Sequence, residues 1–220
     1  MIRLPFNTGL TLSKRRRVPV FRKFGKNFLP HQLLRFLAHS RWLSVIRANE
    51  ENIVVELYGQ RMLLLSSYFI MLANEWNSWE KYYLPIFSLK GKTVLDVGAG
   101  CGETAFFYLL HGAKKVVAIE PDLKAANCLR ENTRRNKWNV EIIPEHFKTE
   151  HLRIPHDFMK MDIEGREGEL LNVSYAKECI VEVHTDELRR KFEERGFRKV
   201  YSSKEGYSLM SFAPRLEKKN

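Results

Sequence analysis

A glycine-rich loop follows the strand-like segment 93–97 and is the part of this sequence best suited to binding a small ligand. The run Asp96-Val-Gly-Ala-Gly-Cys-Gly102 has glycines at positions 98, 100 and 102. Such a backbone can turn tightly and approach a ligand without interference from a Cβ. In open α/β sheets, ligands bind beyond the carboxyl ends of the strands, where this loop is expected. An ordinary turn between a strand and a helix is the alternative.

Two carboxylates near the loop narrow the choice of ligand. The dinucleotide fingerprint G-x-G-x-x-G would need glycine at position 103, where this chain has Glu103. A carboxylate at a helix start that had to hold a pyrophosphate would repel it, so NAD and FAD are disfavoured. Glu120 ends the next predicted strand, about 20 residues after the glycines, and can accept hydrogen bonds from both hydroxyls of a ribose.

The glycine loop, the acidic strand end and a predicted C-terminal hairpin together resemble class I methyltransferases. This resemblance implies S-adenosylmethionine (SAM) as the cofactor, with its methionine portion along the loop and its ribose on Glu120. Asp96 would lie near the methionine amino group or an ordered water, unless it only caps a helix. The residues expected to bind the cofactor are Asp96, Gly98, Ala99, Gly100, Gly102, Glu120, Pro121 and Glu145.

The loop after the third predicted strand is expected to reach the adenine of SAM. Glu145 or a neighbour would accept a hydrogen bond from the adenine amino group, and Phe147 would cover the ring. A solvated loop is the alternative at this position.

A second informative stretch runs from position 157 to 167 and reads D-F-M-K-M-D-I-E-G-R-E. It resembles the FkbM-type branch of the methyltransferases, with a similarity that covers roughly residues 91–205. That branch implies methylation of a hydroxyl group on a small molecule or a glycan. The residues that carry the resemblance are Asp157, Lys160, Asp162, Glu164, Gly165 and Glu167.

The chemistry of methyl transfer assigns roles to some of these residues. Transfer is an in-line displacement at a sulfonium, and a hydroxyl acceptor reacts only after a base or a metal helps to remove its proton. We predict Asp162 for positioning or deprotonating the acceptor, with Glu164 and His184 as further catalytic candidates. The structural alternatives are that Lys160 pairs with a carboxylate and that Glu164 or Glu167 caps the next helix. Mg²⁺ or Ca²⁺ held by Asp162 and Glu164 is an alternative, but two carboxylates alone do not define a metal site, so no metal is predicted.

Strand-like and helical patterns alternate from position 91 onward and predict the fold. Strands are expected at 93–97, 115–120, 140–143, 157–163 and 179–183, with helices at 103–111, 122–136 and 185–195 between them. Asp122 is the predicted N-cap of the second helix, and a further helix is expected to start at Arg166. This alternation predicts a Rossmann-like, doubly wound and mostly parallel sheet of seven strands. Its last two strands, 199–202 and 207–212, would form an antiparallel hairpin around Gly206.

Residues 27–90 are predicted to form a mainly helical N-terminal extension. Apolar residues from Leu33 to Ile46 recur roughly at helical spacing, 52–65 reads as two strands joined at Tyr58-Gly-Gln60, and 66–87 is helical again. The aromatic residues of the last helix would line the acceptor pocket or form an ordinary core seam; they are Trp76, Trp79, Tyr82 and Tyr83. Residues 1–26 are expected to be a basic flexible arm, and 91–220 the SAM-binding domain.

The net charge of +11 belongs entirely to the N-terminal segment. Residues 1–49 contain eleven Lys or Arg and no Asp or Glu, including the run Lys14–Arg17. Basic residues interleaved with Phe6, Phe21 and Phe24 suit contact with RNA phosphates and bases, so an RNA methyltransferase is the alternative function. Against it, the Asn/Asp-Pro-Pro-Tyr/Phe motif of exocyclic-amine methyltransferases is replaced by Asp162-Ile-Glu-Gly165. A noncatalytic protein that binds RNA or a membrane surface is a lesser alternative.

The cysteines and the hydropathy of the sequence indicate the cellular compartment in which the protein is expected. The three cysteines, Cys101, Cys128 and Cys179, form no Cys-x-x-Cys pair, which suits a reducing cytoplasm. The longest uncharged apolar stretch, residues 62–73, is too short to span a bilayer. We therefore expect a cytoplasmic protein without a transmembrane segment, although an Arg-rich organellar transit peptide is an alternative for the first residues.

Overall fold

The computed structural model describes residues 2–3, 11–12, 43–48, 51–203 and 206–213. The chain divides into two compact units. The first comprises residues 1–77 together with 127–138, and the second comprises residues 78–126 and 139–220. The glycine loop and the predicted catalytic residues all belong to the second unit.

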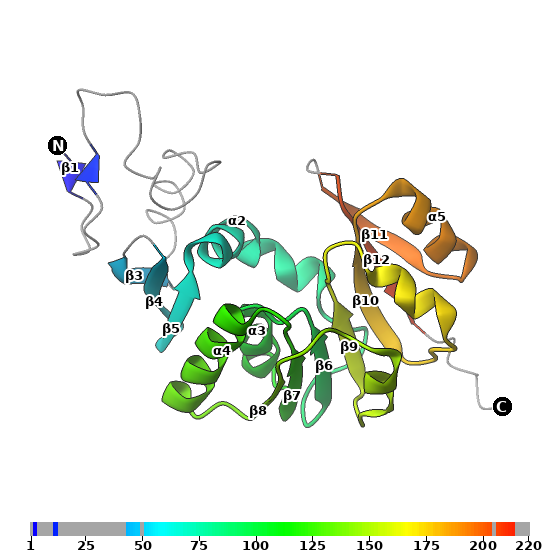
Figure 1. Ribbon diagram of the computed structural model, residues 1–220, viewed down its shortest axis with the longest axis horizontal. Helices are drawn as coiled ribbons and strands as arrows, with labels where there is room; N and C mark the ends of the chain where they lie inside the picture. The colour runs from blue at the N-terminus through cyan, green and yellow to red at the C-terminus, as the bar shows by residue number, and fades with distance from the viewer. Residues whose placement is uncertain (1, 4–10, 13–42, 49–50, 204–205, 214–220) are drawn as a thin grey trace. The chain divides into compact units, whose positions relative to one another are not determined.

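The second unit contains a seven-stranded sheet with the strand order β11-β12-β10-β9-β6-β7-β8. The pairings of β8, β7, β6, β9 and β10 are parallel, and β12 is antiparallel to both β10 and β11 (Figure 1). The predicted mostly parallel sheet with an antiparallel hairpin is therefore confirmed. The strands are β6 (Thr93–Val97), β7 (Lys115–Ile119), β8 (Val140–Ile143), β9 (Phe158–Met161), β10 (Glu178–Val183), β11 (Arg198–Ser202) and β12 (Ser208–Phe212).

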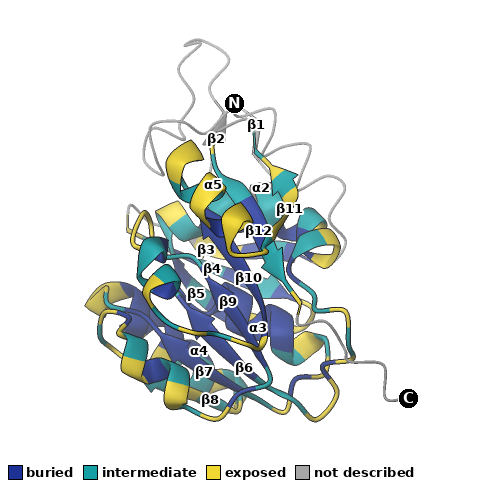
Figure 2. Ribbon diagram, turned by 90° about the vertical axis from the view of Figure 1, so that its right-hand side faces the viewer, coloured by how far each residue is buried: buried dark blue, intermediate teal, exposed yellow. Residues whose placement is uncertain are grey.

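The central strands form because their residues are apolar on both faces. Every residue of β9 and β10 is buried, as are four of the five in β6 and in β7 (Figure 2). A parallel strand covered on both faces reads as such a continuous apolar run. The main core cluster includes Leu95, Val117, Met159, Val181 and Phe192. Lys160 and Glu182 are charged residues within these buried strands, and both lie at the candidate site described below.

Helices follow the strands where local signals start them. Helix α3 (Glu103–Leu110) packs against β6 and β7, and α5 (Asp186–Glu194) packs against β10, β11 and β12. Thr185 caps α5 by accepting a hydrogen bond from the Leu188 N–H. Asp122, the predicted N-cap of α4 (Leu123–Asn136), accepts from the Lys124 N–H at 2.7 Å. The helix predicted to start at Arg166 is a 3₁₀ helix, η3 (Glu167–Asn172), and a second one, η2 (Thr149–Arg153), follows β8.

The first unit contains a three-stranded antiparallel sheet, β3-β4-β5. Its strands are β3 (Leu43–Ala48), β4 (Asn52–Leu57) and β5 (Gln60–Leu65). The predicted hairpin at 52–65 is confirmed, but the helical prediction that reached Ile46 is wrong for residues 43–46, which belong to strand β3. The Asn132 side chain of α4 accepts from the Leu63 N–H at 2.7 Å and donates to the Leu63 carbonyl at 2.9 Å. These two hydrogen bonds pair backbone groups of Leu63 at the edge of β5 that faces no other strand among the described residues.

Helix α2 (Ser66–Tyr82) carries the aromatic residues that the sequence placed at an acceptor pocket or a core seam. Trp76, Trp79 and Tyr83 are buried, and Trp79 packs edge-on against Phe107 at 5.6 Å between ring centroids. Tyr82 packs on Tyr201 instead. The core-seam interpretation therefore holds for Trp79, while Tyr83 also reaches the candidate site.

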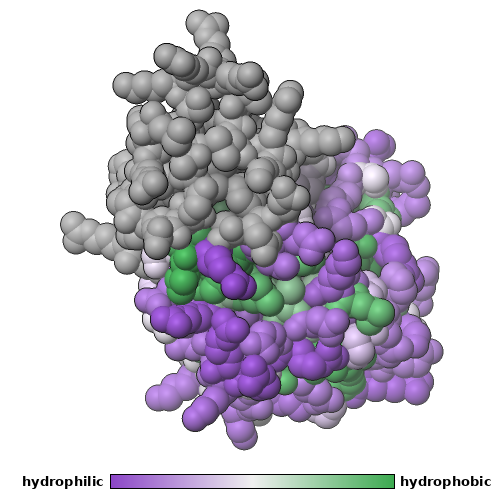
Figure 3. Space-filling view, turned by 60° about the vertical axis from the view of Figure 1, so that its left-hand side comes forward, coloured by the Kyte–Doolittle hydropathy of each residue, from purple (hydrophilic) through white to green (hydrophobic). Residues whose placement is uncertain are grey.

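Of the predicted basic arm, the structure describes only β1 (Ile2–Arg3) and β2 (Thr11–Leu12), which pair antiparallel. The rest of the arm, with Lys14–Arg17, lies outside the described residues, as does most of the segment predicted to be helical from Leu33. Among the described residues, the helices are too short or too polar to cross a membrane. Hydrophilic side chains cover most of the described surface on the face drawn in Figure 3.

Candidate active site

The glycine loop lies at the carboxyl end of β6 and has the backbone conformation that the sequence predicted. Gly98, Gly100 and Gly102 have φ values of 77°, 55° and 98°, which L side chains rarely adopt. The Gly98 N–H donates to the Ile119 carbonyl at 2.9 Å, which holds the start of the loop against the end of β7. A Cβ on Gly98 would lie 1.8 Å from the backbone oxygen of Asp162, so the loop and the end of β9 are in direct contact.

Glu120 ties this loop to the end of β7. The side chain is 5% exposed; its Oε2 accepts from the Gly100 N–H at 2.8 Å, and its Oε1 accepts from the Asp122 N–H at 2.8 Å. A carboxylate oxygen has more than one lone pair, so both oxygens retain the capacity to accept from a ribose hydroxyl. These contacts fit the predicted role of Glu120 in binding the ribose.

We expect Glu120→Ala to weaken SAM binding at least roughly tenfold, because two charge-assisted hydrogen bonds to the ribose would be lost. Titration calorimetry with SAM measures this directly. Glu141→Ala is the matched control, since Glu141 is a carboxylate on the neighbouring strand β8 that pairs with Lys115 at 2.6 Å and is half exposed. A variant at Glu120 that bound SAM as tightly as the Glu141 control would contradict the assignment.

Asp96 is fully buried and is bonded within the protein. Its Oδ2 accepts from the Thr104 hydroxyl at 2.6 Å, and its Oδ1 lies 3.6 Å from the Lys160 ammonium. Lys160 also donates to the Gly98 carbonyl at 2.8 Å. Burial disfavours the ammonium, but the charges of Asp96 and Asp162 outweigh that effect and raise the pKa of Lys160 above its ordinary value. Lys160 therefore links Asp96 and the glycine loop to the end of β9.

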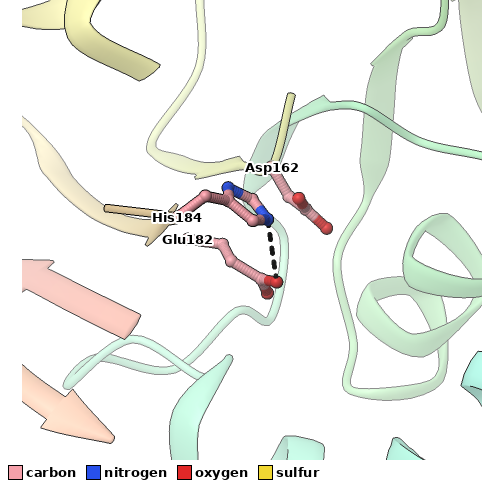
Figure 4. A group of neighbouring side chains, drawn as sticks. All are labelled: Asp162, Glu182 and His184. Atoms are coloured by element: carbon pink, nitrogen blue, oxygen red, sulfur yellow. Dashed lines mark ion pairs between the residues drawn. The ribbon is translucent and has the colours of Figure 1, made fainter. Parts of the chain in front are cut away.

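The predicted catalytic residues Asp162 and His184 meet at the carboxyl ends of β9 and β10. Because Met161 pairs with Val181 in parallel register, Asp162 and Glu182 are side by side on one face of the sheet. His184 is two residues beyond Glu182 and faces the same side. Figure 4 shows the two carboxylates and the imidazole directed toward a common space. The sequence reasoning missed Glu182, for which the only signal was a charged residue inside the apolar run 179–183.

His184 is surrounded by carboxylates. Its Nδ1 lies 3.0 Å from Glu167 Oε1, and its Nε2 lies 3.5 Å from both Glu182 and Glu164. The hydrogen bond with Glu167, and then that with Glu182, raise the pKa of His184 to about 10. An imidazole in that state is already protonated at neutral pH, so it is not suited to act as a base. Glu167, predicted as a possible helix cap, instead accepts from His184 and from the Gly165 N–H at 2.9 Å.

Asp162 is the residue of this cluster whose backbone contacts the glycine loop. Burial, reinforced by the charges of Glu182 and Glu164 and opposed by Lys160, raises the pKa of Asp162 to about 7. A carboxyl group that titrates near neutral pH can accept a proton from a substrate. Glu164 differs: its side chain is 87% exposed and its φ is 54°, so it lies at the rim of the cluster.

Three further residues from the sequence analysis, Glu103, Glu145 and Phe147, make contacts within the protein. Glu103 is buried, and that burial raises its pKa to about 8 against the opposing N–H groups of Glu103 and Cys101. Glu145 pairs with His151 at 2.9 Å and with Lys148 at 2.6 Å, and Phe147 belongs to the hydrophobic core. The predicted contacts of Glu145 and Phe147 with adenine therefore remain predictions.

Comparisons with known proteins show similarity to methyltransferases. Residues 74–163 match the family model of the ribosomal protein L11 methyltransferase (PrmA). The chain is 54% identical over 52 residues to the ribosomal protein L11 methyltransferase of Aquifex aeolicus, which covers 24% of this chain and 21% of that protein. It is 30% identical over 117 residues to that of Carboxydothermus hydrogenoformans, covering 53% and 36%. The chain spans less than two thirds of the length of the curated relatives that it matches first.

Solved structures share the fold at lower identity. The T. thermophilus 16S rRNA N2 G1207 methyltransferase (RsmC), solved with AdoMet and guanosine, has a TM-score of 0.51 at 15% identity and covers 81% of this chain and 59% of its own. The M. jannaschii tRNA m1G37 methyltransferase has a TM-score of 0.50 at 19% identity, covering 74% and 55%. The predicted class I, SAM-dependent methyltransferase fold is thus confirmed. The family model and the proteins named here are ribosomal-protein and RNA methyltransferases, and they do not show the predicted FkbM-like branch.

Proposed function

We propose that this chain, whose fold and family match are those of class I SAM-dependent methyltransferases, transfers the methyl group of SAM to RNA. The observation that carries methyl transfer is the Gly98–Gly102 loop, tied by its Gly100 N–H to Glu120 and lying directly against the backbone of Asp162. When bound, SAM supplies a methyl group on a sulfonium. The chain's own residues then have to hold the acceptor in line and receive its proton.

The choice of RNA rests on charge and on the relatives. All of the net positive charge lies in residues 1–49, and such a block attracts polyanions. Two solved structures with the same fold act on tRNA and on 16S rRNA, according to their names. The chain has Asp162-Ile-Glu-Gly165 where enzymes acting on exocyclic amines usually have Asn/Asp-Pro-Pro-Tyr/Phe. We therefore propose a ribose hydroxyl or a ring nitrogen as the acceptor, with Asp162 receiving the proton.

A methyl-transfer assay with labelled SAM tests this function, with bulk RNA and a small-molecule and glycan extract offered side by side. We expect label in the RNA. Deleting residues 1–26, which contain eight Lys or Arg, should remove salt-sensitive RNA binding while SAM affinity stays unchanged. Each lost phosphate contact should reduce the slope of log K against log salt by about 0.7. RNA that stays unlabelled while SAM binds would contradict the choice of acceptor.

A second candidate is O-methylation of a small molecule or glycan, which the resemblance of residues 157–167 to the FkbM-type branch favours. It predicts label in the extract and unchanged turnover after the deletion. A protein that failed to bind SAM at all would leave only a noncatalytic role in RNA or membrane-surface binding.

A further inference from the structure

Three side chains beyond the carboxyl ends of β9 and β10 have the arrangement of metal ligands. One donor atom each from Asp162, Glu182 and His184 lies within 4.8 Å of the others (Figure 4). The distance from His184 Nε2 to Glu182 Oε1 is 3.5 Å. Ligand atoms that share one ion at about 2.0–2.2 Å are themselves roughly 3–4 Å apart, so this spacing needs little rearrangement.

The imidazole of His184 is held in the orientation that a metal ligand requires. Its Nδ1 faces Glu167 at 3.0 Å, and Glu167 is fully buried. The Gly165 N–H fixes the same Glu167 oxygen at 2.9 Å. A histidine whose Nδ1–H is bound to a carboxylate presents its Nε2 lone pair on the opposite side, and carboxylate–histidine–metal arrangements of this kind are common in metalloproteins. Here Nε2 lies 3.5 Å from Glu182, and Asp162 lies on the same side of the ring (Figure 4).

The cluster also has an acceptor without a partner and an excess of negative charge. Asp162 Oδ1 is buried and has no hydrogen-bond donor among the described residues. The carboxylates that surround the imidazole are Asp162, Glu164, Glu167 and Glu182. Lys160, the nearby cation, lies 3.7 Å from Asp162 Oδ2 but is shared with Asp96. A divalent cation beside a neutral His184 adds two positive charges to these four carboxylates, where a single imidazolium adds one.

We propose that Asp162, Glu182 and His184 form a binding site for a divalent transition-metal cation, such as Mn²⁺ or Zn²⁺. A donor set of one imidazole nitrogen and two carboxylates suits these ions, whereas Mg²⁺ and Ca²⁺ prefer oxygen ligands alone. Three protein ligands leave coordination positions open, as in catalytic metal sites.

The role of the cation rests on the proposed methyl transfer. A cation at this position would lie beside the glycine loop and lower the pKa of an acceptor hydroxyl. The acceptor oxygen loses its proton to the Asp162 carboxylate and bonds the methyl carbon, while the carbon–sulfur bond breaks and sulfur keeps the electron pair. Binding of the cation itself requires neither SAM nor the acceptor, so it can be measured separately from activity.

The test is titration calorimetry of the full chain with MnCl₂, without SAM, after dialysis against a chelator. We expect one Mn²⁺ per chain, with binding at least tenfold weaker in Asp162→Asn and in His184→Gln. Glu167→Gln should weaken binding roughly tenfold as well, because it releases the orientation of His184. Asp186→Asn is the control: Asp186 is an 81% exposed carboxylate two residues from His184, paired with Arg189, and its loss should leave binding unchanged. MgCl₂ should bind more weakly than MnCl₂.

A spectroscopic measurement on the wild-type protein tests the metal site without relying on variants that fold poorly. Electron spin-echo spectra of the wild-type protein with Mn²⁺ should contain the coupling of a directly bound imidazole nitrogen. Absence of that coupling, or absence of stoichiometric Mn²⁺ binding in a protein that still binds SAM, would overturn the metal site and leave the proposed methyl transfer standing. Loss of SAM binding alone would contradict the proposed function and not the metal site.

Discussion

Replacing Gly98 with alanine is expected to abolish measurable SAM binding and to lower the free energy of unfolding by about 3 kcal/mol or more. The added Cβ would lie 1.8 Å from the backbone oxygen of Asp162, a group that cannot move aside like a flexible side chain. The φ of 77° adds the strain of a left-handed conformation. Because the Gly98 backbone also binds Ile119 and Lys160, relief of the clash would displace the whole loop.

Gly91 provides a matched control for this prediction. Its φ is also 77°, but a Cβ there meets nothing within 4 Å. Gly91→Ala should therefore cost only the conformational strain, about 1–2 kcal/mol, and leave SAM binding intact. Urea denaturation and titration calorimetry on both variants separate the two effects. Equal losses of stability with equal SAM affinities would show that the close approach of the loop to Asp162 does not exist.

The glycine loop and the central sheet were predictable because their signals are local. Buried parallel strands appear as continuous apolar runs, and the run Thr93–Val97 ends at glycines that have positive φ in the structure. The caps Asp122 and Thr185 likewise act within three residues of their own position. Such features need no knowledge of what packs against them.

The segment that forms β3 was mispredicted because the spacing of its apolar residues fits both a helix and a strand. Leu43 and Val45 are both buried while Ile46 is 37% exposed, which is the alternation of a strand. Over so few residues this alternation overlaps with helical spacing. Antiparallel pairing of β3 with β4 decides the outcome, and that pairing depends on tertiary structure.

The candidate site was predictable only in part for a similar reason. Asp162 and His184 stand at strand ends, where sequence reasoning looks for ligands. Glu182 lies inside an apolar strand and becomes part of the site only through the register of β9 against β10. Glu167 and His184 are 17 positions apart in the sequence, so their contact is not a local feature. Glu167 begins a 3₁₀ helix, whereas the sequence predicted only that a helix would start near this position.

Lys160→Met should be the most destabilising substitution of a charged residue in this cluster, with a loss of about 3–5 kcal/mol. The methionine fills a similar volume but leaves buried Asp96 without its cation and the Gly98 carbonyl without its donor. Lys92→Met is the matched control, because Lys92 forms a 3.2 Å ion pair with Asp157 that is more than a third exposed on both sides. An exposed pair of this kind contributes at most about 1 kcal/mol.

The pH dependence distinguishes this loss of charge from a simple packing defect. Burial already raises the pKa of Asp96 above its ordinary value, an effect that Lys160 opposes. Without Lys160 that pKa rises further, so the folded variant binds a proton that the unfolded chain does not bind. Its free energy of unfolding should therefore increase as the pH falls from 8 toward 5, relative to the wild type. Denaturation of Lys160→Met and Lys92→Met across this range measures the effect; a deficit that stayed constant with pH would mean that Lys160 stabilises the fold by packing and not by compensating Asp96.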